Sequence, residues 1–174
     1  SSLQKIDITG NVALKADNDF GVNPAGFIIH SAIHGGREDA GCVIHTHSRA
    51  ATAVSAGRAG LLPLSQSAMF FHGRVSYHDF EGSAVRPEER ARLVADLGGN
   101  DAMLLRNHGT LVVGRNVAHA FLQAYQLENA CRIQVDALAS GEVVLPPDAV
   151  AESVRLTAAD PLFSSGAGAA LEWR

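Results

Sequence analysis

The chain has 174 residues, of which 47% are hydrophobic and 18% charged, and its formal net charge is −4. This length suits one domain with a substantial core, so we expect residues 1–174 to form a single domain with a weakly ordered tail from about residue 158. There is no basic surplus, no apolar run of the roughly 20 residues that a membrane span needs, and no signal-peptide pattern. We therefore expect neither nucleic acid nor a membrane as a partner. Cys42 and Cys131 are isolated, which favours reduced thiols in a cytoplasmic protein.

Short helical and extended segments alternate along the chain. In order, the sequence predicts a hairpin within 1–24, a helix at about 26–34, a strand at 42–47, a helix at about 49–56, extended pieces at 61–65 and 74–77, a loop at 78–83, a helix at 87–97, strands at 102–105 and 110–113, a long helix at about 117–139 and a last helix from 146 to about 157. Mixed elements without regular β-α-β repeats indicate an α/β sandwich with a mixed sheet.

A pair of histidines stands out in the predicted strand at 42–47. Residues i and i+2 of a strand project from the same face, so His45 and His47 can converge on one point. His108 follows a second apolar run and precedes Gly109, whose freedom allows a turn that aims the ring. Three imidazoles at one place make a metal site with open coordination positions, as a catalytic metal requires. The alternative is two histidines satisfied by hydrogen bonds near the core. Nitrogen ligands suit zinc, and also iron, cobalt, nickel or copper.

Further polar side chains are candidates to line this site. His30 and His34 share one face of the predicted helix at about 26–34, and we expect them to line the site rather than to bind metal directly. Glu81, in a loop rich in Tyr, His and Asp, is the best carboxylate candidate for a proton donor. Arg106 and Asn107 precede His108 and are candidates for substrate contacts, although a surface ion pair is the default for an arginine.

These residues together resemble the class II aldolase/adducin family over about residues 5–140. The resemblance is carried by Asn23-Pro24-Ala25-Gly26-Phe27, by His30 and His34, by His45-Thr46-His47-Ser48, by Gly60-Leu61-Leu62-Pro63-Leu64-Ser65, by Tyr77-His78-Asp79-Phe80-Glu81-Gly82, by Leu105-Arg106-Asn107-His108-Gly109 and by Glu128-Asn129-Ala130-Cys131. The resemblance implies a three-layer α/β/α sandwich with a mixed, largely antiparallel sheet. It also implies a homotetramer with sites at subunit interfaces and a divalent metal, zinc first and Fe(II) as the alternative. His45, His47 and His108 occupy the matching ligand positions.

Three departures from the family pattern matter. Sugar-phosphate aldolases of this family carry an acid/base glutamate four residues before the position of His30, where this chain has Gly26. Glu81, His30 or a segment outside this chain would have to replace it. Family members also begin some tens of residues earlier, with a loop that grips the substrate's phosphate, so we expect the chain to be cut at both ends. The segment from Asn23 to Phe27 is closer to the adducin-like branch.

Three functions follow as expectations. The first is a metal-dependent lyase that cleaves a carbon–carbon bond in a small hydroxy or keto compound, by aldol-type cleavage or decarboxylation. The second is a non-haem iron oxygenase acting on an aromatic hydroxy or keto acid, since a three-histidine face also suits Fe(II). The third is a non-catalytic adducin-like scaffold, which has no reason to keep an imidazole cluster.

Overall fold

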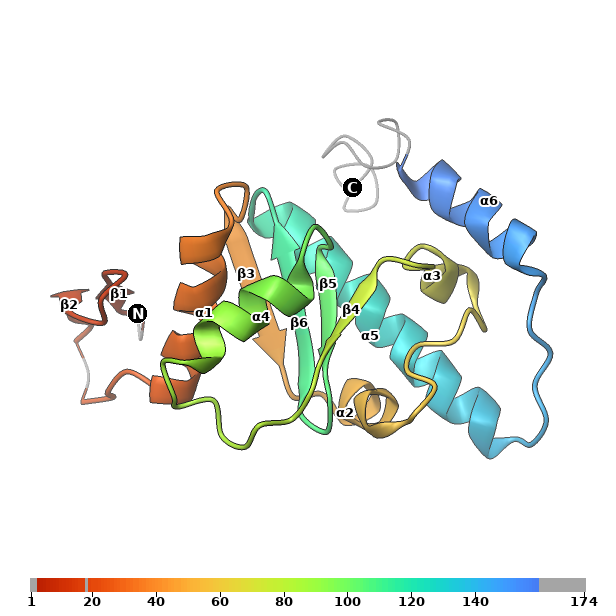
Figure 1. Ribbon diagram of the computed structural model, residues 1–174, viewed down its shortest axis with the longest axis horizontal. Coiled ribbons are helices and arrows are strands. Elements are labelled where there is room, and N and C mark those ends of the chain that lie inside the picture. Colours follow the sequence, from red (N-terminus) through yellow and green to blue (C-terminus); the bar gives the residue numbers. More distant parts are fainter. Residues whose placement is uncertain (1–2, 18, 160–174) are drawn as a thin grey trace.

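A four-stranded mixed sheet forms the centre of the molecule in a computed structural model that describes residues 3–17 and 19–159. Its strand order is β3 (Cys42–Thr46), β6 (Gly109–Gly114), β5 (Ala102–Leu105) and β4 (Val75–His78). The β3–β6 and β5–β6 pairs are antiparallel and the β4–β5 pair is parallel (Figure 1). The mixed, largely antiparallel sheet is therefore confirmed. The tail predicted from about residue 158 lies almost entirely outside the described residues.

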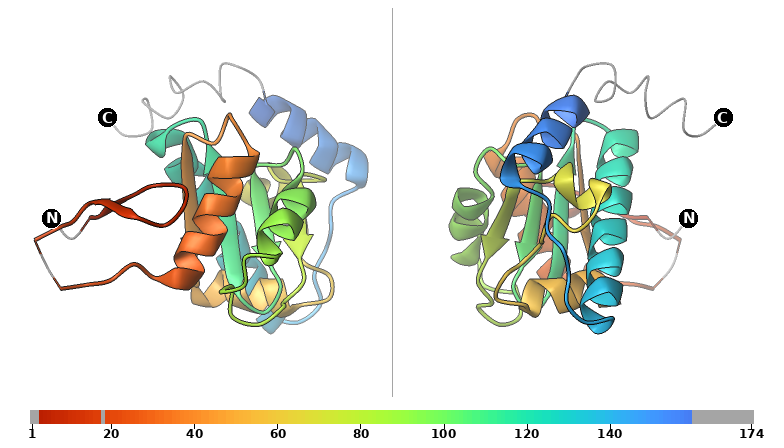
Figure 2. Two further views of the ribbon diagram at one scale, coloured as in Figure 1. Left: turned by 60° about the vertical axis from the view of Figure 1, so that its left-hand side comes forward. Right: turned by 90° about the vertical axis from the view of Figure 1, so that its right-hand side faces the viewer.

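Helices cover both faces of this sheet and make three layers (Figure 2). On one face lie α1 (Pro24–Gly36) and α4 (Glu89–Leu97), which pack against each other and against β3 and β4. On the other lie α2 (Arg49–Ala56), α3 (Gln66–Met69) and α5 (Val117–Ala139), and α6 (Asp148–Ala159) packs on α3. Every residue of β5 and β6 is buried, as expected for strands covered on both sides.

Strand alternation divides the core into two clusters. Met103, Leu105 and Leu111 pack toward α1 and α4, whereas Leu104 and Val112 pack toward α2 and α5. The same alternation sends His45 to the α1–α4 face, because it is two residues from Val43, which belongs to the first cluster. Sequence periodicity thus fixes which layer the histidines face.

Two local predictions were wrong at the middle of the chain. Residues 61–65 form no strand, because side chains take up two of the backbone amides that a strand would pair: Tyr77 Oη accepts from Leu61 at 3.1 Å and Gln134 Oε1 accepts from Leu62 at 2.7 Å. The short helix α3 follows there, capped by Ser65, whose Oγ accepts from the Ala68 amide. His78 is the last residue of β4 and is buried, where a loop was expected.

The N-terminal hairpin stands apart from the main sheet. It joins β1 (Lys5–Ile6) to β2 (Val12–Leu14) and projects beside the start of α1 (Figures 1 and 2). Asp7 holds its turn by accepting hydrogen bonds from the backbone and side chains of Thr9 and Asn11. These bonds, the Thr9 side chain's first, keep the pKa of Asp7 well below its usual range.

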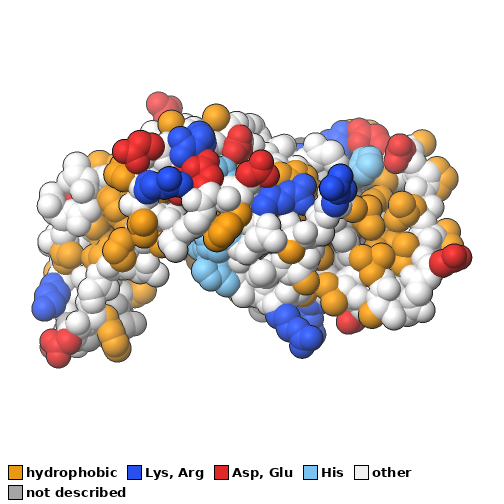
Figure 3. Space-filling view, turned by 60° about the horizontal axis from the view of Figure 1, so that its bottom comes forward, with side chains coloured by type: hydrophobic (Ala, Val, Ile, Leu, Met, Phe, Trp, Pro, Cys, Tyr) orange, Lys and Arg blue, Asp and Glu red, His pale blue; other side chains and the backbone are white. Residues whose placement is uncertain are grey.

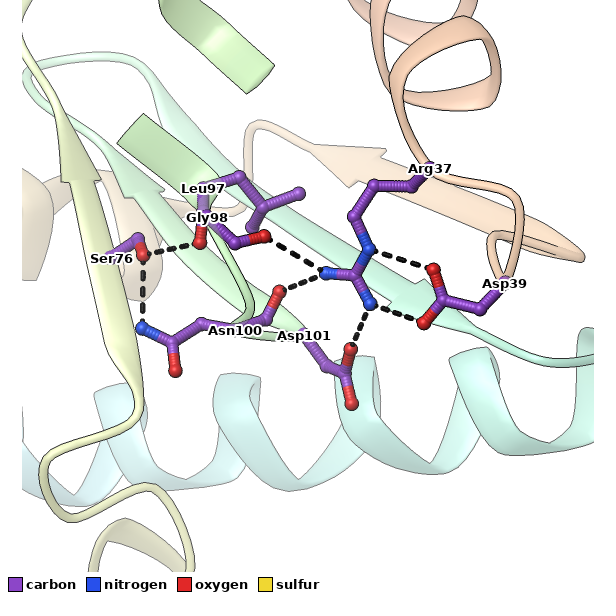
Figure 4. A network of polar contacts seen from close by, with 7 residues as sticks. All are labelled: Arg37, Asp39, Ser76, Leu97, Gly98, Asn100 and Asp101. Carbon is purple, nitrogen blue, oxygen red and sulfur yellow. Dashed lines mark hydrogen bonds and ion pairs between the residues drawn. The ribbon is translucent and has the colours of Figure 1, made fainter. Parts of the chain in front are cut away.

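A polar network closes the edge of the sheet where β3 and β5 begin (Figure 4). The Arg37 guanidinium, at the end of α1, donates to Asp39 and to Asp101 Oδ1 at 2.9 Å. Next to it, Asn100 Nδ2 donates to Ser76 Oγ at 3.1 Å, and Ser76 donates to the Leu97 carbonyl at 2.9 Å. This network ties the ends of α1 and α4 to the start of β5.

Among the described residues, no helix is long and apolar enough to cross a membrane.

Candidate metal centre

The opposite edge of the sheet, where β3 and β5 end, brings together the three predicted histidines. The ring centroids of His45, His47 and His108 are 4.4–4.9 Å apart, and each ring offers a nitrogen within 4.8 Å of the other two. His45 lies in β3, His47 follows that strand, and His108 lies in the turn between β5 and β6. Antiparallel pairing of β3 with β6, with Thr46 opposite Thr110, sets the two segments side by side.

The turn that carries His108 depends on its two neighbours. Asn107 has φ of 57°, in the left-handed region that a short polar side chain tolerates. At Gly109, an added Cβ would lie 2.1 Å from the Thr46 carbonyl oxygen, so only glycine allows β3 to approach. His108 is therefore aimed by the backbone.

Hydrogen bonding determines which nitrogen of His45 is free. Its Nδ1 lies 2.8 Å from the Thr110 carbonyl oxygen, which can only accept, so Nδ1 carries the proton. The Nε2 lone pair is then directed at the cluster, where it lies 2.8 Å from His47 Nε2. Burial lowers the pKa of His45 to about 4, assisted by the charges of His108, His47 and His30 and opposed by the Thr110 bond. Burial also lowers the pKa of His108. Both rings are neutral near pH 7, the form that binds metal.

Residues behind the cluster hold its backbone, and the sequence analysis assigned none of them a role at the site. Thr52, in α2, donates its hydroxyl to the His108 carbonyl at 3.1 Å. Ser48 caps α2 and donates to the carboxylate of Glu128 in α5. The spacing of Ser48 and Thr52, one turn apart on a helix that starts right after His47, is the signal that could have found them.

His30 and His34, which the sequence analysis expected to line the site, both lie on α1. His30 is half-buried, and burial followed by the charge of His34 lowers its pKa. The charge of His30 in turn lowers the pKa of His45, so the two rings are close enough to interact electrostatically. His34 is exposed, and its Nδ1 lies 3.0 Å from the Ala40 carbonyl.

Glu81 is poorly suited to the proton donor role predicted for it. Its carboxylate accepts from Arg92 Nε at 2.6 Å and also from Arg92 Nη2, and Arg86 Nη2 is 3.7 Å away. The Arg92 hydrogen bonds hold the pKa of Glu81 below its usual range. A carboxyl that is kept ionised has no proton to give, and the sequence did not reveal the pairing because Arg92 lies eleven residues away on α4.

Arg106 and Asn107 do not form a single substrate-binding group. The Arg106 guanidinium lies 4.2 Å from the Tyr77 ring centroid and donates to the Gly57 carbonyl at 2.8 Å, so it caps the end of α2. Asn107 is exposed at the turn that precedes His108. The prediction of Arg106 as a substrate contact is thus at odds with its fixed position.

His78 and Phe80, which belong to the motif at 77–82, also lie near His108. His78 is buried, with Nδ1 2.7 Å from Asp96 Oδ2 and Nε2 3.4 Å from Glu89 Oε1, and its charge contributes to the lowered pKa of His108. The Phe80 ring lies 6.2 Å from the His108 ring and is 55% exposed. In Figure 3, histidine side chains gather at the surface beside the hollow that separates the N-terminal strands from the body.

Comparisons with known proteins agree with this geometry. The class II aldolase and adducin N-terminal domain matches residues 1–135. A class 2 aldolase-like protein of Caulobacter vibrioides is 50% identical over 157 residues, which are 89% of this chain and 60% of that protein. Rat alpha-adducin is 45% identical over 141 residues, 80% of this chain and 19% of its own length. The crystal structure of an aldolase II superfamily protein from Pseudomonas syringae has a TM-score of 0.90 at 46% identity and covers 99% of this chain and 68% of that chain.

Proposed function

Because the chain belongs to the class II aldolase and adducin family, we propose that it acts as a metal-dependent lyase. Its reaction is the cleavage of a carbon–carbon bond in a small hydroxy or keto compound, by aldol-type cleavage or by decarboxylation. The chain spans 60% of the length of its Caulobacter relative. The activity is therefore proposed on the basis of the histidine cluster that this chain carries. That cluster, with two rings held neutral by burial, is the observation that supports the proposal most strongly.

The residues fit a divalent cation by their chemistry. His45 directs a lone pair into the cluster because Thr110 fixes its proton on Nδ1, and His47 and His108 offer nitrogens within 4.8 Å. Three nitrogen ligands with open positions are typical of catalytic zinc, which we propose first, with Fe(II) as the alternative. A divalent cation supplies Lewis-acid chemistry there, because its charge stabilises the electron pair left on substrate oxygens when the bond breaks.

Proton transfer is the task left to the chain's own side chains. Gly26 carries no carboxylate, and Glu81 is held ionised by Arg92. His30 is the remaining titratable side chain of α1 whose charge reaches His45, and its lowered pKa keeps the imidazole neutral. We assign it the role of base, which takes the substrate's hydroxyl proton on a ring nitrogen and returns it to product.

The test is metal analysis of four proteins purified without chelators. The unchanged chain should hold one zinc per protomer, and His45→Ala and His108→Ala should each hold less than a tenth of that, because a two-nitrogen site binds far more weakly. His72→Ala is the matched control, a half-buried histidine outside the cluster, and should keep its metal. Full occupancy in both cluster variants would contradict the assignment, provided circular dichroism shows that all fold alike.

Two other functions make different predictions in the same assays. An iron oxygenase acting on an aromatic hydroxy or keto acid is favoured by the three-nitrogen donor set, and it would lose activity without dioxygen and regain it with Fe(II), whereas zinc would not restore it. A non-catalytic scaffold is favoured by the similarity to alpha-adducin, and it would bind no metal.

The proposal also includes a homotetramer with the site at a subunit interface and a location in the cytoplasm. Membership of the family supports the first, and the free thiols of Cys42 and Cys131 support the second. Sedimentation of the metal-loaded protein measures the assembly directly.

A further inference from the structure

A cleft of about 520 Å³ lies between the N-terminal hairpin and α1, and its lining is mostly apolar. The apolar side chains come from both walls: Leu3, Ile6, Ile8, Phe20, Val22 and Phe27. Several of them are unusually exposed for their type, with Phe20 at 73% and Ile8 at 52%. A concave apolar surface that is rimmed by polar residues is typical of a ligand-binding site.

His30 links the cleft to the histidine cluster. His30 and His34 belong to its lining, and the charge of His30 bears on His45 within the cluster. Gly26, one turn before His30, also lines the cleft, where an added Cβ would meet only Asn23 atoms at 3.8 Å. A ligand whose polar end reaches the three histidines can therefore extend its other end along α1 toward the hairpin.

The charges around the cleft exclude one class of ligand. Among the described residues that line it there is no lysine or arginine, and the one carboxylate, that of Asp7, is held ionised by the Thr9 and Asn11 hydrogen bonds. The nearest arginine on the packed helix α4, Arg90, donates to the Ser31 carbonyl at 3.2 Å and has its guanidinium carbon 6.0 Å from the Phe27 ring centroid. A phosphate dianion in the cleft would lose water without meeting a lysine or arginine of the lining, which is unfavourable.

We propose that the cleft binds the uncharged, apolar side group of a 2-hydroxy or 2-keto acid whose carboxylate end reaches His45, His47 and His108. This inference rests on the proposed function for the polar end of the ligand, and on the cleft alone for the apolar end. A phenyl-sized group fits the volume and the aromatic walls that Phe20 and Phe27 provide. The specificity is therefore for hydrocarbon bulk at carbon 3, and against phosphate there.

Three 2-hydroxy acids that differ only at carbon 3 test the proposal: lactate, 3-phenyllactate and 3-phosphoglycerate. Calorimetry with the zinc-loaded protein should give 3-phenyllactate an affinity at least tenfold above that of lactate, with 3-phosphoglycerate no tighter than lactate. Phosphoglycerate binding more tightly than phenyllactate overturns the proposal. Equal affinities for lactate and phenyllactate also overturn it, because the cleft is then covered by another segment or another copy of the chain.

A pair of lysine variants locates the effect in the cleft. Val22→Lys places a cation in the lining and should reduce the preference for phenyllactate over lactate to twofold or less, while improving phosphoglycerate binding. Val12→Lys is the matched control on β2, 45% exposed and outside the lining, and should leave the preference unchanged. Identical behaviour of the two variants overturns the assignment.

A metal-independent probe separates this inference from the proposed function. Benzyl alcohol carries no acid group, so its binding to metal-free protein should be weakened severalfold by Val22→Lys and unaffected by Val12→Lys. If no hydroxy acid binds in a metal-dependent way, the lyase proposal fails while the benzyl alcohol result still decides the cleft. If benzyl alcohol shows no binding that Val22→Lys weakens, the cleft proposal fails whatever the metal analysis gives.

Discussion

The two edges of the central sheet are built in opposite ways. At the edge where β3 and β5 begin, the Arg37 guanidinium is matched by two carboxylates and by backbone carbonyls. At the edge where they end, three imidazoles face one another, and no carboxylate approaches the cluster closely enough to be grouped with it among the described residues. One edge satisfies its own charges and contributes to stability. The other leaves nitrogen lone pairs directed at a common point. This arrangement is typical of a ligand-binding site.

Two glycines make the sharpest comparison between the edges. An added Cβ would lie 2.1 Å from the Thr46 carbonyl at Gly109 and 2.2 Å from the Arg115 carbonyl at Gly41. Gly109→Ala and Gly41→Ala should each lower the free energy of unfolding by about 2–4 kcal/mol, since backbone must shift in both. Only Gly109→Ala should also lower zinc affinity, by about tenfold or more, because the shift moves His108. Urea unfolding and zinc titration measure the two effects, and equal zinc affinities would remove the distinction between the edges.

Removing the matched charge at the first edge should affect stability alone. Arg37→Ala leaves Asp101 and the Asn100 carbonyl without their partner, so we expect a loss of about 1–3 kcal/mol in the free energy of unfolding. Zinc content should stay within a tenth of that of the unchanged chain. A fall in zinc content at unchanged stability would show that the two edges are coupled.

Acid should lower the stability of the metal-free protein because of His45, which lies at the second edge. Burial lowers the pKa of folded His45 to about 4, and the unfolded value is 6.5, so the unfolded chain binds a proton first as the pH falls. Stability is therefore complete above pH 6.5 and decreases between pH 6.5 and 4, by on the order of 1–2 kcal/mol after solvent screening. Chelator-treated protein unfolded in urea at several pH values shows the decrease, which His45→Ala should flatten. If the free energy of unfolding depends on pH in the same way in His45→Ala, other groups cause the decrease.

The smallest effect on zinc content and turnover is expected from changing Glu81. This residue lies near the second edge, but its charge is paired with an arginine, as the charges at the first edge are paired. Glu81→Gln should leave zinc content unchanged and turnover within twofold, because the carboxylate serves Arg92 rather than substrate. His30→Gln is the contrasting variant and should lower kcat more than it raises KM. A large loss of kcat in Glu81→Gln with normal kcat in His30→Gln would reverse the two roles.

The sequence predicted what depends on local periodicity. The i, i+2 spacing of His45 and His47 placed both rings on one face, and the apolar run before His108 placed that residue at a strand end, so their convergence followed from the sheet. The long helix was predicted at about its observed bounds, Val117–Ala139, because its apolar spacing is sustained over many turns.

What it missed depends on packing between segments far apart in the chain. Glu81 meets Arg92 only because α4 folds back over β4, and Arg106 turns to Tyr77 and the end of α2. His78 is buried between Glu89 and Asp96, seven residues apart on the same helix face, which a loop prediction could not show. Short-range pattern carries no information on such pairings.

The antiparallel ladder between β3 and β6 has a consequence for how a cation would be acquired. Because backbone pairing and the Gly109 turn set the histidines in place, ion capture requires no refolding, and a captured ion can be exchanged while the scaffold stays intact. Three imidazoles rank divalent ions by intrinsic affinity, which places copper and zinc above iron and manganese. An iron-dependent activity of this protein would consequently need a cell that keeps zinc and copper scarce around the newly made chain.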